Sequence, residues 1–130
     1  MKIEVKSAAA TLGKFMVEFN NVYPTIFLRF YKSDDFSVDN RYPHNTKVKD
    51  FVPLPIVIEA SENITLLEMD NLLTKKLGVK YIEIVYYPKT GAGALRFVGS
   101  ELQMSIKLIM EKGIREQWLT EKQKGKLKLS

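Results

Sequence analysis

The chain has 130 residues and a formal net charge of +5. This length suits one domain that buries its own core, and the absence of cysteine excludes disulfides, thiolate metal sites and thiol nucleophiles. No apolar run approaches the ~20 residues of a membrane span, and the N-terminus lacks a signal-peptide pattern. We therefore expect a soluble, cytoplasmic protein without a membrane contact.

The positive charge is concentrated at the C-terminal end. Residues 107–130 hold seven cations and three anions, a net charge of +4, so the remainder carries only +1. The stretch 121–130 is lysine-rich and predicts a basic, disordered tail.

The N-terminal part, 1–32, predicts a strand, a helix and a second strand. "KIEVK" alternates as a strand does, and Thr11 suits the N-cap of a helix whose apolar positions include Phe15, Phe19 and Tyr23. The residue before a proline avoids the helical region, so Tyr23-Pro24 should end this helix before the strand "TIFLRFY".

The same pattern returns further along the chain at a constant offset of 54 in residue number. "PIVIEA" predicts a strand, Thr65 suits an N-cap, Gly78 suits a left-handed C-cap, and "KYIEIVYY" predicts another strand. Seven pairs of positions match without a gap: Thr11 and Thr65, Leu12 and Leu66, Phe15 and Met69, Phe19 and Leu73, Tyr23 and Leu77, Leu28 and Ile82, Phe30 and Ile84.

These observations predict an α+β fold of two duplicated βαβ units. Right-handed crossovers would place both helices on one face of one sheet, in a ferredoxin-like βαββαβ arrangement. Tandem β-grasp-like halves are the competing layout.

The repeat resembles a group of small, uncharacterised bacterial proteins built from two β-α-β repeats. The likeness rests on Thr11-Leu12 with "IFLRFY" and on Thr65-Leu66 with "YIEIVYY", and it covers residues 1–98. It implies a shape and carries no known activity.

The C-terminal third adds further elements to a single domain of residues 1–120. "YYPKTGAGALRFVG" predicts a hairpin, and residues 100–119 predict a helix, although 100–112 also alternates as a strand would. The predicted divisions are repeat 1 over 1–32, a connecting loop over 33–54 and repeat 2 over 55–98.

One predicted sheet face is rich in aromatic residues. Strand alternation places Phe27, Arg29 and Tyr31 on the face of Tyr81, Glu83, Val85 and Tyr87. Such a face can bind a partner protein, can stack the bases of single-stranded nucleic acid, or can be core beneath the C-terminal helix and Trp118.

Catalytic and metal sites find little support. The only histidine, His44, lies in a loop with Asp34, Asp35, Asp39 and Asp50, but their spacing does not match a metal-binding loop. "PKTGAG" lacks the spacing of a phosphate-binding loop, and no serine has an evident base. We expect no enzyme activity, no metal and no cofactor.

The sequence thus predicts a non-enzymatic protein interaction or adaptor module that binds through the aromatic face or an edge strand. The alternative is a single-stranded RNA- or DNA-binding domain, and a homodimer through the edge strands stays open. The candidate binding residues are Phe27, Arg29, Tyr31, Tyr81, Tyr87, Lys124, Lys126 and Lys128.

Overall fold

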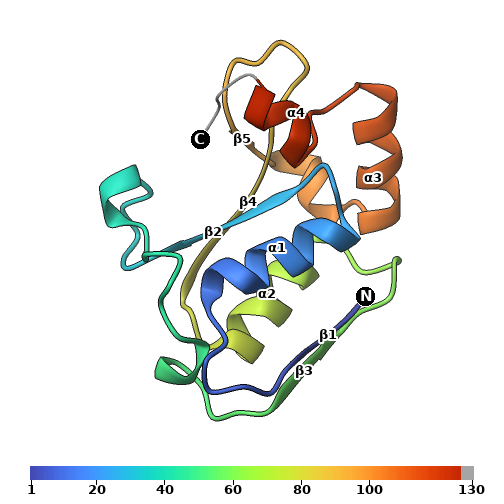
Figure 1. Cartoon of the computed structure of the whole chain (residues 1–130). Helices are drawn as coiled ribbons and strands as arrows, with labels where there is room; N and C mark the ends of the chain where they lie inside the picture. Colours follow the sequence, from blue (N-terminus) through green and yellow to red (C-terminus); the bar gives the residue numbers. More distant parts are fainter. Residues whose placement is uncertain (127–130) are drawn as a thin grey trace.

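The computed structural model of the chain describes residues 1–126 (Figure 1). Its elements are β1 (Lys2–Val5), α1 (Leu12–Val22), β2 (Phe27–Tyr31), β3 (Ile56–Glu59), α2 (Leu66–Leu77), β4 (Tyr81–Tyr86), β5 (Leu95–Arg96), α3 (Ile106–Arg115) and α4 (Glu121–Lys126). Short 3-10 turns occupy residues 38–40, 48–50 and 99–103. The α+β class is confirmed, and so are the two strand–helix–strand repeats.

Both repeat helices begin and end where their cap residues predict. The Thr11 hydroxyl accepts a hydrogen bond from the Lys14 amide, and Thr65 forms a reciprocal capping box with Glu68. The second helix ends at Gly78, whose φ of 72° is the left-handed conformation that glycine adopts without strain.

The predicted single sheet is wrong. The strands form two small antiparallel sheets, one of β1 and β3 and one in the order β2-β4-β5. The helices α1 and α2 lie between the β1–β3 pair and the β2–β4 pair (Figure 1). Apolar residues of both strand pairs and both helices belong to one buried cluster, among them Ile3, Ile58, Phe19, Leu73 and Leu28.

Other segments pair with part of the outer edge of β2 and part of the outer edge of β4. Residues 40–42 run beside β2, where the Tyr42 amide donates to the Phe30 carbonyl and the Lys32 amide donates to the Asn40 carbonyl. The strand β5 pairs with β4. In a ferredoxin-like sheet β2 and β4 would flank β1 and β3, whereas here they pair with each other.

A pseudo-twofold axis relates the two repeats. When each residue of a strand pair is replaced by its equivalent in the other repeat, 54 positions away, the result is another observed pair. The pair of Lys2 and Glu59 thus becomes Ile56 and Val5. The axis passes between Arg29 and Glu83, which are partners across β2 and β4 and are themselves related by the repeat offset.

The duplication also includes the segment that follows each repeat. In the first copy this segment bridges to Tyr31 and then to the N-cap Thr11. In the second copy it pairs with Val85 and then bridges to the N-cap Thr65. The contacted positions are related by the repeat offset in both cases, so each unit is a βαβ repeat plus a return segment that crosses the N-terminus of its helix.

The C-terminal part differs from its prediction in two places. The helix expected over residues 100–119 is instead a 3-10 turn over 99–103 followed by α3. Residues 121–126 of the expected disordered tail form α4, while residues 127–130 lie outside the described part. Within residues 1–126, no helix has the length and apolar composition to cross a membrane.

Candidate functional site

The predicted sharing of the aromatic face is confirmed by the strand register. Phe27, Arg29 and Tyr31 lie opposite Val85, Glu83 and Tyr81 respectively. The other face of the same two strands carries apolar side chains that pack on the helices.

The rings of Phe27, Tyr31 and Tyr87 are buried, which agrees with the alternative in which they are core and not with an open binding platform. Tyr31 is 1% exposed, Tyr87 2% and Phe27 8%. Leu119 packs with Phe27 and Tyr87, and the Phe36 ring stacks on Tyr31 with centroids 4.7 Å apart. The C-terminal segment therefore covers one end of the face and the first return segment covers the other.

Trp118 does not take part in this cover, contrary to one of the alternatives above. Its ring stacks on Tyr86 with centroids 4.2 Å apart and contacts Phe97. Both partners belong to the main core cluster on the other side of β4. Leu119, the next residue, is the one that reaches the aromatic face.

A buried polar network occupies the middle of the face. The Tyr31 hydroxyl donates to Glu83 Oε1 at 2.9 Å, and Arg29 donates to the Tyr87 hydroxyl at 2.7 Å. Glu83 also pairs with Arg29 at 3.7 Å and with Arg96 at 3.2 Å. One carboxylate thus neutralises cations from two units, beside the pseudo-twofold axis.

A groove of about 430 Å³ runs along the outer edge of β2. We call it the β2 groove. Its walls come from α1, β2, residues 41–44, Tyr87 and α4. The charged side chains that line it are those of Arg29, Arg41, Glu121 and Lys124, and Val17 lines it from α1.

The floor of the β2 groove carries backbone groups that face away from β4. The Phe30 carbonyl accepts from Tyr42, so the backbone groups of Phe30 point outward, and strand alternation directs those of Leu28 the same way. No hydrogen bond among the described residues uses the Leu28 amide, the Leu28 carbonyl or the Phe30 amide. These are the groups that a strand edge offers to an extended chain.

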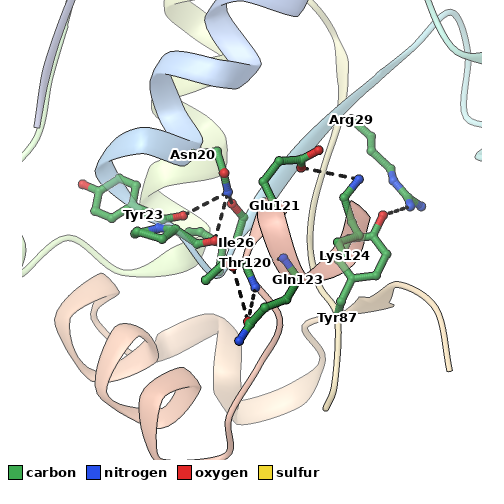
Figure 2. A network of polar contacts seen from close by, with 10 residues as sticks. Asn20, Tyr23, Ile26, Arg29, Tyr87, Thr120, Glu121, Gln123 and Lys124 are labelled. Carbon is green, nitrogen blue, oxygen red and sulfur yellow. Dashed lines mark hydrogen bonds and ion pairs between the residues drawn. The ribbon is translucent and has the colours of Figure 1, made fainter. Parts of the chain in front are cut away.

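Helix α4 contributes Glu121 and Lys124 to the lining of the β2 groove, and Figure 2 shows both side chains. Lys124 pairs with Glu121 at 3.5 Å, and its ammonium lies 5.3 Å from the Phe27 ring centroid and 5.2 Å from that of Tyr87. The helix begins after Thr120, whose amide donates to the Gln123 side chain at 2.9 Å. The Phe27 and Tyr87 rings, which the sequence predicts as binding residues, therefore make cation–π contacts with Lys124 of α4.

A second, smaller groove of about 160 Å³ lies along the outer edge of β4. We call it the β4 groove. Its residues Leu67, Asp70 and Glu83 are the repeat equivalents of Gly13, Met16 and Arg29 in the β2 groove. Arg96 and Arg41 occupy the equivalent bridges to Val85 and Tyr31, so the two grooves are pseudo-symmetric.

Asp70 lies in the β4 groove, and its carboxyl should make the stability of the fold depend on pH. Burial raises the pKa of the Asp70 carboxyl above its ordinary value, so the folded chain binds this proton more tightly than the unfolded chain. The free energy of unfolding then falls as the pH rises from the unfolded pKa through the folded pKa. We expect Asp70→Asn to be more stable than the wild type near neutral pH and equal to it at about pH 3. Urea unfolding of both proteins across this range measures the difference, and a difference independent of pH would contradict the assignment.

The structure brings some of the predicted site residues together and separates others. Phe27, Arg29, Tyr87 and Lys124 line the β2 groove. Tyr31 and Tyr81 lie at the far end of the face, while Lys126 is exposed and Lys128 lies outside the described residues. Their binding role stays a prediction.

Arg41 is a charged groove residue that the sequence does not identify as part of a site. It lies in the predicted connecting loop, and only its bridge to Tyr31 relates it to Arg96. His44 of the same loop lines the groove and its carbonyl accepts from the Gly13 amide. Within residues 1–126, no three or more His, Cys, Asp or Glu side chains are grouped so that they could hold a metal ion.

No protein-family model, curated protein or solved structure matches the chain. The resemblance to two-repeat bacterial proteins therefore stays a prediction, and function is inferred from the geometry of the grooves.

Proposed function

We propose that the protein is a non-enzymatic interaction module that binds an extended segment of a partner protein in the β2 groove. The observation that carries this proposal is the part of the β2 outer edge at the groove floor, the Leu28 amide and carbonyl and the Phe30 amide, that no hydrogen bond among the described residues uses. An added strand gains affinity from main-chain hydrogen bonds and specificity from pockets for alternate side chains.

Burial of this edge gives a second reason for the proposal. Leu28 and Phe30 are buried because their side chains enter the core, so their outward backbone groups have little contact with water. Buried backbone donors and acceptors are almost always paired in folded proteins. An extended segment in the groove would supply the missing partners.

Base stacking is the less favoured function. It needs ring faces that a nucleotide can reach, whereas Tyr31, Tyr87 and Phe27 are covered by the chain itself. The lysines of α4 attract phosphates at low salt, but this attraction is not sequence-specific.

A bead-displayed library of random heptapeptides tests the proposal with the full, fluorescently labelled chain. We expect a defined set of peptides to be enriched. Val17→Trp should abolish their binding, because Val17 is 60% exposed and lines the β2 groove, so that an indole there fills the groove without disturbing the core.

The matched control places the same side chain in the other groove. Leu67→Trp changes an exposed position of the β4 groove and should leave peptide binding intact. Absence of any enrichment contradicts the proposal, as does binding that survives Val17→Trp or is lost only with Leu67→Trp.

A further inference from the structure

We propose that the extended segment bound in the β2 groove is acidic, and that one of its carboxylates sits against Arg41 where Glu83 sits against Arg96 in the other unit. This inference rests on the proposed function and names the chemistry of its partner. The two pseudo-symmetric grooves differ at the positions that carry charge.

The β4 groove contains its own carboxylates. Glu83 Oε2 lies 3.2 Å from Arg96 Nε, and Asp70 lines the same groove. The arginine of the second return segment is therefore neutralised within the chain.

The β2 groove lacks a carboxylate at both equivalent positions. The residue equivalent to Glu83 is Arg29, and the residue equivalent to Asp70 is Met16. Arg41, the counterpart of Arg96, has no ion pair among the described residues, and its Nε is buried there without a hydrogen-bond partner. The same fold thus holds an arginine with a carboxylate in one unit and without one in the other.

The remaining charges of the β2 groove do not compensate for this loss. Arg29, Arg41 and Lys124 are its cations, and Glu121 is the only carboxylate among the described residues that line it. Glu121 pairs with Lys124, on the α4 side of the groove. The Arg41 end therefore keeps a positive charge that an incoming carboxylate would neutralise.

The position of Arg41 suits it for recognition. Its guanidinium lies 5.9 Å from the centroid of the Tyr31 ring, which restrains it at the groove wall. Its neighbour Tyr42 donates a backbone hydrogen bond to Phe30 on the groove floor. A segment that pairs with Leu28 and reaches the Phe30 amide would thus end beside Tyr42 and carry a side chain toward Arg41. An arginine engages a carboxylate through a planar fork of donors.

The test uses the peptides that the wild type enriches from the random heptapeptide library. We expect Asp or Glu at one fixed position of the enriched peptides. Replacing that residue by its amide should weaken binding about tenfold, a typical effect of one charge-assisted hydrogen bond. Arg41→Gln should weaken binding of the acidic peptide by a similar factor and leave binding of the amide peptide unchanged.

Arg96→Gln is the matched control, because it removes the equivalent arginine from the β4 groove and should preserve the acidic preference. Arg41→Lys keeps the charge and should retain part of the preference, and it serves as the second variant should Arg41→Gln fail to fold. Enriched peptides without an acidic position, or equal effects of Arg41→Gln on acidic and amide peptides, would overturn the inference while the proposed function stands.

A binding measurement with oligonucleotides distinguishes a nucleic-acid partner from a protein partner. Labelled mixed-sequence single-stranded RNA and DNA should show no binding that depends on Arg41 at near-physiological salt. Arg41-dependent binding of either oligonucleotide under these conditions would overturn the acidic-peptide inference. If no peptide at all is enriched, the proposed function fails and this inference fails with it.

Discussion

Replacing Glu83 by alanine should lower the free energy of unfolding by about 3 kcal/mol, the magnitude expected when one partner of a buried ion pair is removed. Glu83 is buried and accepts a hydrogen bond from the Tyr31 hydroxyl while it pairs with Arg29 and Arg96. The substitution removes the carboxylate that pairs with Arg29, whose side chain is only 15% exposed. Urea unfolding followed by circular dichroism measures the change.

The control for this prediction is Glu59→Ala, which removes an exposed carboxylate from β3 and should change the free energy of unfolding by less than about 0.5 kcal/mol. Glu83→Gln should fall between the two, because the amide keeps an acceptor for Tyr31 but removes the charge. If Glu83→Ala were as stable as Glu59→Ala, the network would contribute nothing to the fold.

Replacing Trp118 by alanine should cost about 3–5 kcal/mol, the range for truncating a buried aromatic side chain. Trp118 is 4% exposed and packs on Tyr86 and Phe97, and it stands between α3 and α4. Because α4 brings Lys124 to the groove, the same change should also weaken peptide binding.

Ile114→Ala is the control for Trp118→Ala, since Ile114 lies in the same C-terminal extension, residues 106–126, and is 76% exposed. It should leave both the unfolding midpoint and peptide binding near the wild-type values. A Trp118→Ala protein that unfolds at the wild-type denaturant concentration would show that the C-terminal extension contributes little to the core.

The sequence predicts the local structure of each repeat well. The cap residues Thr11 and Thr65 and the apolar spacing that follows them define both helices, because capping and amphipathic periodicity depend on nearby residues. The sharing of faces in β2 and β4 follows from strand alternation and is also confirmed.

The pairing of the strands of the two repeats could not be predicted from local sequence patterns. Strand alternation fixes the faces of β2 but not the strand that pairs with its edge, so one sheet and two sheets are equally compatible with the pattern. The return segments were missed because their lengths differ. Arg41 and Arg96, like the bridge residues Lys47 and Ser105, are separated by more than the repeat offset, so an ungapped comparison loses them.

The candidate site was foreseen in part. Arg29, Tyr87 and Lys124 were predicted from the aromatic strands and the basic C-terminus, and the structure brings them to one groove. The sequence leaves open whether the aromatic rings are exposed or core, because Leu119 and Phe36, which cover the rings, are distant in sequence and carry no pattern that predicts such contacts.

The most direct test of the account is a ¹H–¹⁵N correlation spectrum recorded while an enriched acidic heptapeptide is added. We predict that the amides of Leu28 and Phe30 shift and become protected from hydrogen exchange, while those of Ile82 and Ile84, their equivalents at the edge of β4, stay unchanged. Shifts confined to Ile82 and Ile84 or to the β1–β3 sheet, with Leu28 and Phe30 unaffected, would contradict binding in the β2 groove.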